Sequence, residues 1–333
     1  MGILVLGMHR SGTSALAGTL VGLGLDAGEP TSLMAPDEGN PEGYFEQQPI
    51  VDLNEEILLR EGGRWDSPPV LGANWMTPDD LTSARALYAN LYASSHFVMK
   101  DPRVSLLLAL WRASAPQAPS AVFIMRDPLQ VAWSLAKRDA IPVVTGLSLW
   151  SAFNRAALEG AAGMRVHVCT YRDLVERPEE VLDALATSLR AWGELPEDAS
   201  VAAAMARVNP DLRRNTAPVS DDRRLEAPAE IEDLARYLES LVGRHDAFAA
   251  TCPPPGWWEG ALLEERRVLV AERTGAVTSR DAIIETLKTD NEALRAQSRE
   301  LREDLTATTA DLEALRNVAP VRLLRALGRV TRR

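Results

Sequence analysis

The stretch ILVLGMHRSGTS, residues 3–14, decides the fold of this chain. Its first four residues are an apolar run typical of a buried strand, and the segment from Ser14 to Leu23 predicts a helix. Gly7 and Gly12 bracket the residues between them, so backbone N–H groups can curl around an anion. The N-terminus of the following helix adds partial positive charge. The stretch therefore predicts a phosphate- or sulfate-binding loop; an ordinary glycine-rich turn is the alternative.

This loop departs from the nucleotide triphosphatase pattern GxxxxGK[ST] at one position. Thr13 stands where that pattern has lysine, and the cation is Arg10 instead. A nucleotide triphosphatase needs the lysine on the β- and γ-phosphates. A P-loop kinase or NTPase is therefore the second choice among enzyme classes.

The rest of residues 1–250 alternates short apolar runs with helical patterns, which is typical of βαβ units. Further strands are expected at 96–99, 121–125 and 165–170, and helices at 81–92, 105–113, 130–137 and 178–192. The predicted fold class is α/β: a P-loop-type parallel sheet flanked by helices, followed by a C-terminal coiled-coil helix.

Two motifs resemble the cofactor site of sulfotransferases that use 3′-phosphoadenosine 5′-phosphosulfate (PAPS). Residues 10–13, Arg-Ser-Gly-Thr, are similar to the family's 5′-phosphosulfate loop. Residues 126–128, Arg-Asp-Pro, with Ser134 in the following helix, are similar to its 3′-phosphate site. An arginine at the end of a strand can bind a phosphate through paired hydrogen bonds. The resemblance implies that Arg10 binds the 5′ end of PAPS and that Arg126 and Ser134 bind its 3′-phosphate.

Two further segments extend the resemblance over residues 1–215. Residues 100–103, Lys-Asp-Pro-Arg, resemble a segment of tyrosylprotein sulfotransferases in which the lysine contacts the transferring sulfuryl group. Residues 171–174, Tyr-Arg-Asp-Leu, resemble a segment whose tyrosine reaches the cofactor; a packed core aromatic is the alternative for Tyr171. The cofactor-binding residues implied are His9, Arg10, Ser11, Gly12, Thr13, Ser14, Arg126, Ser134, Tyr171 and Arg213.

The general base is expected in the long loop that ends at Glu46, since His9 lies inside the phosphate loop and is badly placed for that task. Residues 40–46 resemble an Asn-Pro-x-Gly-Tyr-Phe-Glu segment of bacterial sulfotransferase-like proteins. This favours Glu46, then Glu42, then Glu38; solvated loop charges are the alternative. The predicted catalytic residues are Glu46, Glu42, Lys100 and Arg10. Arg213 and Arg214 are candidates to close over the 3′-phosphate, or else a surface basic pair.

Composition limits the function further. The chain has 333 residues and a net charge of −11, which argues against broad nucleic-acid binding. Cys169 and Cys252 lie outside any metal-binding spacing, so neither a metal site nor a disulfide framework is expected. The N-terminus has no signal-like segment, and no apolar run approaches the ~20 residues of a membrane span. We expect a cytoplasmic protein.

Residues 252–256, Cys-Pro-Pro-Pro-Gly, mark a change of domain. We expect a sulfotransferase domain at 1–250, a Pro/Gly linker at 251–261, a coiled coil at 262–317 and a basic amphipathic tail at 318–333. The heptad places apolar residues at positions a and d from Ile284 to Leu315, although Ser298 and Thr308 are polar. Asn291 at position a favours two strands. Self-association through 284–315 is favoured over a helix folded back on the domain.

Residues 320–333 carry five arginines among aliphatic residues, so this segment is either a helix on an anionic membrane surface or a solvated basic tail. The first possibility places the protein at the inner face of a membrane, where a glycan or glycolipid acceptor is expected. The sequence thus predicts a PAPS-dependent sulfotransferase that acts on a hydroxyl or amine, with carbohydrate favoured. A coiled-coil scaffold carrying a degenerate domain is the non-enzyme alternative.

Overall fold

A computed structural model describes the chain except for residues 1, 36–42, 93, 95, 209–225 and 331–333. Contacts divide the chain into two compact units, Met1–Leu269 and Val270–Arg333. Four candidate site residues lie outside the described residues: Glu38, Glu42, Arg213 and Arg214.

The first unit is built on a five-stranded sheet with the order β2-β1-β3-β4-β5. Its strands are β1 (Gly2–Leu6), β2 (Phe97–Lys100), β3 (Ser120–Met125), β4 (Val166–Thr170) and β5 (Gly243–His245). The first four strands run parallel, and β5 pairs antiparallel with β4. The expected α/β fold with a parallel sheet is confirmed, and the antiparallel edge strand is an addition to it.

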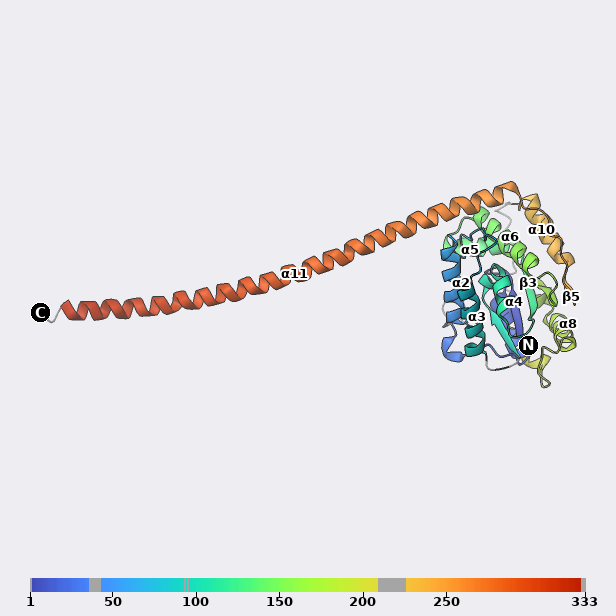
Figure 1. Ribbon diagram of the computed structural model, residues 1–333, viewed down its shortest axis with the longest axis horizontal. Coiled ribbons are helices and arrows are strands. Elements are labelled where there is room, and N and C mark those ends of the chain that lie inside the picture. The colour runs from blue at the N-terminus through green and yellow to red at the C-terminus, as the bar shows by residue number, and fades with distance from the viewer. Residues whose placement is uncertain (1, 36–42, 93, 95, 209–225, 331–333) are drawn as a thin grey trace. The chain divides into compact units, whose positions relative to one another are not determined.

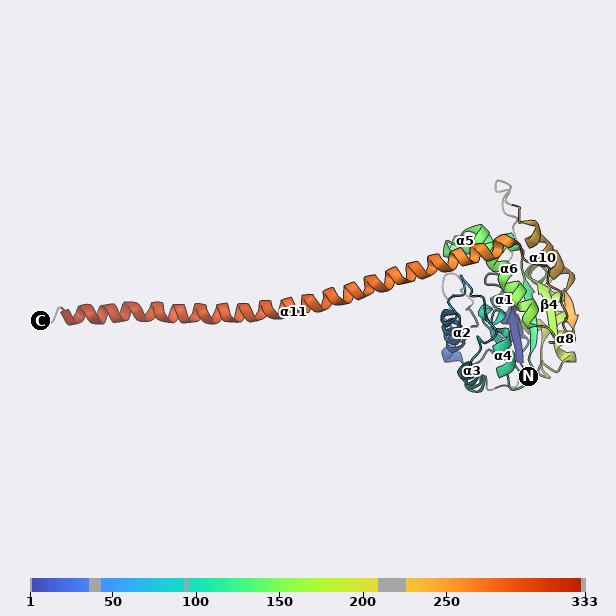
Figure 2. The ribbon, with the colours of Figure 1, turned by 45° about the horizontal axis from the view of Figure 1, so that its top comes forward.

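Helices cover both faces of the sheet (Figures 1 and 2). Against one face pack α1 (Thr13–Gly22), α7 (Tyr171–Glu176), α8 (Pro178–Ala191) and α9 (Val201–Met205). Against the other pack α2 (Gln48–Arg60), α3 (Pro78–Leu91), α4 (Leu108–Ser114), α5 (Pro128–Asp139), α6 (Val143–Gly160) and α10 (Ala229–Ser240). Successive strand residues point to opposite faces of the sheet. Leu4 therefore packs against the helices on the α2 side, and Val5 packs against those on the α1 side. This double burial explains why the strands are continuous apolar runs.

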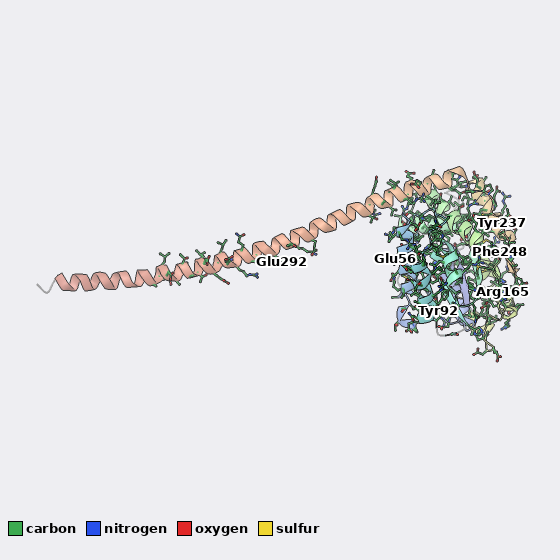
Figure 3. The ribbon with its side chains drawn as sticks, viewed as in Figure 1. Glu56, Tyr92, Arg165, Tyr237, Phe248 and Glu292 are labelled. Atoms are coloured by element: carbon green, nitrogen blue, oxygen red, sulfur yellow. The ribbon has the colours of Figure 1, made fainter. Side chains whose placement is uncertain are left out.

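The segment after β5 is fixed to the first unit by a buried aromatic side chain and a backbone hydrogen bond. Phe248 is 1% exposed and packs in the larger core. The N–H of Thr251 donates to the hydroxyl of Tyr237 over 2.7 Å. Figure 3 labels Tyr237 and Phe248.

The C-terminal helix α11 runs from Trp257 to Val330. Its first turns belong to the first unit, because Leu263 packs on the core there and Arg266 binds the Asp66 carboxylate over 2.6 Å. The helix therefore begins inside the expected linker at 251–261. In the second unit the chain remains helical to Val330, and the coiled coil stays a prediction. Among the described residues, no helix is both long and apolar enough to cross a bilayer.

Candidate functional site

The strand order places the candidate site. The chain leaves β1 to form β2 on one side and then β3 on the other, so the connections after β1 and β3 diverge at their carboxyl ends. Open α/β sheets bind ligands in the crevice at such a switch point. The loop of residues 7–12 follows β1, and Arg126 follows β3. The order of strands thus brings the two motifs together.

The loop after β1 has the conformation of an anion cradle. Gly7 donates its N–H to the Ser105 hydroxyl over 3.0 Å, which anchors the start of the loop. Arg10 and Gly12 adopt positive φ angles of 68° and 93°, and the N–H of Ser11 returns to the carbonyl of Met8 over 3.1 Å. Within the described part of the chain, the N–H groups of Arg10 and Gly12 make no backbone hydrogen bond. These donors remain available to an anion.

The residues expected at the two ends of a nucleotide lie in direct contact. The Arg10 Nε donates to the Ser134 Oγ over 2.8 Å. An Nη of Arg126 donates to the Arg10 carbonyl over 3.1 Å, and its guanidinium lies 4.6 Å from the centre of the Tyr171 ring. A methyl group on Gly12 would meet that same ring at 2.3 Å. The loop, the end of β3, α5 and α7 therefore contribute to one cluster: Arg10, Gly12, Arg126, Ser134 and Tyr171.

This cluster concentrates positive charge in a partly buried place. Burial is the main cause that lowers the pKa of Arg10 and of Arg126, and repulsion from Arg138 adds to the first and from Arg10 to the second. Among the described residues, no carboxylate lies within ion-pair distance of Arg10. Both guanidiniums stay charged, since arginine does not deprotonate in proteins. An anion at this place would relieve the repulsion.

A cation-Asp-Pro sequence ends both β2 and β3 and explains their local geometry. Asp127 caps α5 by accepting from the Gln130 N–H over 2.8 Å, and Pro128 occupies its first turn. Asp101 caps the 3₁₀-helix Pro102–Ser105 in the same way, accepting from the Arg103 N–H over 3.0 Å. In both cases the strand is followed at once by a helix. Lys100 and Arg126 are thereby held at the carboxyl edge of the sheet.

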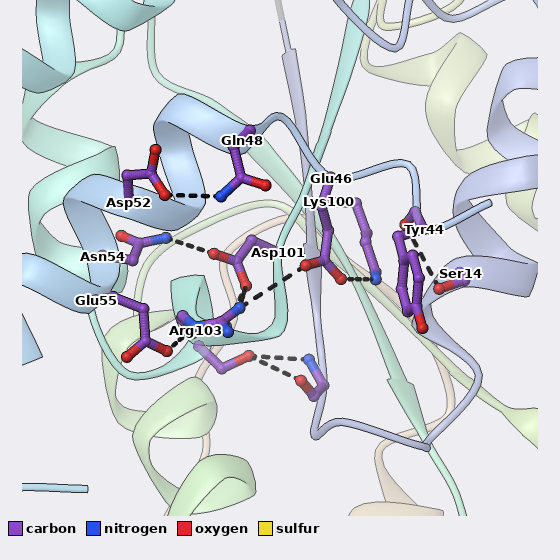
Figure 4. Close-up of polar contacts among 12 residues, drawn as sticks. Ser14, Tyr44, Glu46, Gln48, Asp52, Asn54, Glu55, Lys100, Asp101 and Arg103 are labelled. Carbon is purple, nitrogen blue, oxygen red and sulfur yellow. Dashed lines mark hydrogen bonds and ion pairs between the residues drawn. The ribbon is translucent and has the colours of Figure 1, made fainter. Parts of the chain in front are cut away.

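Beside the loop, Glu46 and Lys100 form a buried ion pair (Figure 4). Glu46 is 5% exposed and Lys100 is 3% exposed. Arg103 lies 3.7 Å from the other carboxylate oxygen of Glu46. Burial raises the pKa of Glu46 above its ordinary value, while Lys100 opposes that rise and Asp101 adds to it. A carboxylate whose pKa is raised is a stronger base than an ordinary one, so it is better suited to take a proton from an acceptor.

A second layer of hydrogen bonds holds this pair (Figure 4). Asp101 is fully buried, accepts from the Asn54 amide over 2.8 Å and pairs with Arg103 over 2.9 Å. Asn54 accepts in turn from the Trp111 indole over 2.9 Å, and Arg103 reaches the Glu55 carboxylate over 2.5 Å. These contacts link Asn54, Asp101, Arg103 and Glu55 in series, and within the described residues one buried oxygen of the series, Glu55 Oε2, has no hydrogen-bond partner. The network therefore restricts where Arg103 and the neighbouring Glu46 carboxylate can lie.

The backbone before Glu46 turns sharply to deliver that side chain. Gly43 and Phe45 have positive φ angles of 89° and 56°. The Ser14 hydroxyl donates to the Tyr44 carbonyl over 3.5 Å, which links this segment to the start of α1. The Gln47 amide donates to the Ala27 carbonyl over 2.8 Å. These contacts fix both ends of the segment that carries Glu46.

His9 of the loop packs against two aromatic side chains. Its ring lies 4.4 Å from the ring of Trp65 and 5.6 Å from that of Phe153. Burial, followed by the charges of nearby cations with Arg103 first, lowers the pKa of His9 well below its ordinary value, so the imidazole is neutral. Its Nε2 is buried without a partner within the described residues. The residue next to Trp65 in the sequence, Asp66, pairs with Arg266 of α11.

A cavity of about 370 Å³ opens beside the arginine cluster. Its walls include Arg126, Trp150 and Tyr171 from the carboxyl edge of the sheet and α6, with Glu232 and Arg236 from α10. Its volume is in the range of small-molecule sites, roughly 300–1,000 Å³. A ligand whose phosphate reached Arg126 could place its remaining atoms here.

Most of the residues predicted from the sequence thus meet at one edge. The residues brought together are His9, Arg10, Ser11, Gly12, Thr13, Ser14, Glu46, Lys100, Arg126, Ser134 and Tyr171. The sequence assigned no role to four further residues at the site: Asn54, Trp65, Asp101 and Arg103. Two of these, Asp101 and Arg103, belong to the motif at residues 100–103, which was the one local indication of them. Among the described residues, no group of three His, Cys, Asp or Glu side chains is arranged to hold a metal.

Gly12→Ala is expected to abolish anion binding at the loop. The new methyl group would lie 2.3 Å from the Tyr171 ring at a backbone φ of 93°, so the loop or the ring must move. The matched control is Gly62→Ala, which has a similar φ of 83° but nothing within 4 Å. Both variants pay backbone strain of about 1 kcal/mol, but only the first has the clash. Calorimetry with adenosine 3′,5′-bisphosphate checks this, and equal affinity in both variants would contradict it.

Comparisons with known proteins are limited to distant structural likeness. No family model matches the sequence, and a search of curated proteins finds no match. A sulfotransferase domain from the curacin biosynthetic pathway is similar at 14% identity and a TM-score of 0.35, covering 79% of this chain and 96% of that one. A sulfotransferase domain from the Synechococcus PCC 7002 olefin synthase is similar at 18% identity and a TM-score of 0.39, covering 80% and 94%. At these TM-scores the likeness assigns no function to this chain.

Proposed function

We propose that this protein is a PAPS-dependent sulfotransferase. One observation carries the proposal: Arg10 after β1 and Arg126 after β3 converge on one crevice, with Ser134 and Tyr171 beside them. The sequence resemblance assigns these residues to one nucleotide with phosphoryl groups at both ends. Their meeting at the switch point of the sheet is what such a ligand requires.

The residues present fit an anionic nucleotide in three respects. Arg10 is half-buried, and within the described residues no carboxylate forms an ion pair with it. The Ser11 hydroxyl is fully buried without a partner there and lies in the loop itself. Tyr171 and Trp150 offer aromatic walls to the cavity next to Arg126, where a nucleoside can lie.

The chain's own residues supply the remaining requirements of sulfuryl transfer. When bound, PAPS supplies the sulfuryl group and retains the bond's electrons on its 5′-phosphate. Arg10 and the loop N–H groups place positive charge at the leaving phosphate, and Lys100 places it at the sulfuryl oxygens. Glu46 takes the proton of the acceptor hydroxyl or amine. The Asp101 and Arg103 contacts keep the Glu46 carboxylate oriented.

We infer a carbohydrate acceptor as the more specific form of this function. The inference is supported by the sequence of residues 320–333, whose arginines suit an anionic membrane surface where lipid-linked glycans are made. Envelope glycans, a small phenol and a tyrosine peptide, each incubated with radiolabelled PAPS, distinguish the acceptor classes. If the label appeared only on the phenol or only on the peptide, the proposed carbohydrate acceptor would be contradicted.

Calorimetry with adenosine 3′,5′-bisphosphate tests the donor site directly. We expect saturable binding of the bisphosphate and no comparable heat from ATP with magnesium. The reason is that Thr13 replaces the lysine that a nucleotide triphosphatase needs. Binding of ATP with magnesium but not of the bisphosphate would reject the sulfotransferase and favour the NTPase class.

A further inference from the structure

The second unit exposes a row of leucines along α11. Leu301, Leu305 and Leu312 are 62%, 66% and 62% exposed. They occupy positions d, a and a of the heptad, so they share one side of the helix. The other described side chains from 295 to 314 are also exposed (Figure 3), although most of them are polar or small. A single apolar row on a long helix is the feature that packs against another helix.

We propose that this row binds a second copy of the same chain, and that the two helices pair parallel and in register. The charges beside the row decide both the partner and the direction. Position e, on one flank, holds the exposed basic side chains Lys288, Arg295 and Arg302. Position g, on the other flank, holds the exposed side chains Gln297, Asp304 and Asp311. One flank is therefore basic and the other is polar to acidic.

Parallel and antiparallel pairs use these flanks differently. In a parallel pair, position g of one helix faces position e of its partner. The acidic flank then meets the basic flank on both sides of the seam. In an antiparallel pair, e faces e and g faces g, so arginine would meet arginine and aspartate would meet aspartate. Like charges in contact disfavour that arrangement.

A second copy satisfies the charge pattern without any other protein. The helix carries both complementary flanks, so two identical chains related by a two-fold axis along the seam match on both sides. Ser298 at position a and Thr308 at position d interrupt the leucine row. Polar residues at these positions cost stability but favour one register over a slipped one.

A parallel pair would carry the two copies of the first unit at the same end of the seam. Residues 320–333 of both chains would follow its other end, and each copy carries five arginines there. Two linked basic segments bind an anionic surface more tightly than one, because the second contact becomes intramolecular.

Two cysteine variants of the full chain test the direction. Ser298→Cys and Thr308→Cys are each made with Cys252→Ser, since Cys169 is buried. In a parallel, in-register pair each residue meets its own copy, so we expect both variants to form a disulfide-linked dimer under mild oxidation. In an antiparallel pair only a residue at the centre meets its own copy, so at most one variant would cross-link. The outward-facing Thr306→Cys is the control and is expected to stay uncross-linked.

A charge reversal gives an independent readout. Arg295→Glu with Arg302→Glu is expected to raise the dissociation constant about tenfold or more in sedimentation, since both flanks become acidic. In an antiparallel pair, position e faces position e, so the same change replaces contacts between arginines by contacts between glutamates. The dissociation constant would then stay almost unchanged. Arg299→Glu, at the outward-facing position b, is the matched control. A wild-type chain that sediments as a monomer, a single cross-linking variant, or an unchanged constant would each overturn the proposal.

Discussion

Arg126→Ala is expected to weaken binding of adenosine 3′,5′-bisphosphate about 100-fold, or roughly 2.7 kcal/mol, and to leave adenosine 5′-monophosphate almost unaffected. The reason is that Arg126 is assigned to the 3′-phosphate, which the monophosphate lacks. Hydrogen bonds to charged groups are strong, and the half-buried position of Arg126 limits screening by solvent. Calorimetry with both ligands measures the difference between the two affinities.

The reciprocal variant tests the other end of the nucleotide. Arg10→Gly keeps the positive φ of 68° without strain and removes the guanidinium, so we expect both ligands to lose affinity. The comparison matters because Arg10 and Ser134, assigned to opposite phosphates, are hydrogen-bonded to each other over 2.8 Å. Equal losses for both ligands in Arg126→Ala would contradict the assignment. Arg85→Ala, an exposed arginine on α3, is the control, and thermal unfolding checks that Arg126→Ala still folds.

Glu46→Gln is expected to lower kcat about 100- to 10,000-fold with little change in the affinity for the bisphosphate. Glutamine keeps the shape of the side chain but cannot accept the acceptor's proton. In the wild type the carboxylate is the active form, and burial raises its pKa above the ordinary value of 4.5. Activity should therefore fall as the pH drops through that raised pKa, and this acidic limb should be absent from the residual activity of the variant.

Lys100→Met is expected to change the same dependence of activity on pH in a second way. Lys100 lowers the pKa of Glu46 by its charge and by a hydrogen bond, so its removal should move the acidic limb to higher pH. We also expect kcat to fall about 100- to 1,000-fold, because the charge at the sulfuryl oxygens is lost. Glu56→Gln, on the exposed side of α2 (Figure 3), is the control for both variants. The role of Glu46 would be contradicted by two results together: the acidic limb of the pH profile keeps its position in Lys100→Met, and it is still present in Glu46→Gln.

The sequence predicted the parallel strands well because both of their faces are buried. A strand of that kind is an unbroken apolar run, as at residues 3–6 and 121–125, and it is recognisable without knowledge of its neighbours. Several elements were missed, among them α2, α10, β5 and α6, and the last two show two different reasons. β5, residues 243–245, is short and polar, so only its pairing with β4 makes it a strand. α6 is buried around much of its surface, so it lacks the single apolar stripe that signals a helix.

The phosphate loop and the cation-Asp-Pro turns were set by the sequence, because glycine conformation, aspartate capping and proline at a first turn are properties of neighbouring residues. The contact between Arg10 and Arg126 was not set by neighbouring residues. These two residues are 116 positions apart, and only the strand order β2-β1-β3 makes them adjacent. The pairing of Glu46 with Lys100, and the place of Trp65 against His9, likewise depend on long-range packing. The chain's local chemistry thus determined which groups could bind an anion, and the tertiary structure decided which of them face one another, since burial and distance exist only after the sheet has formed.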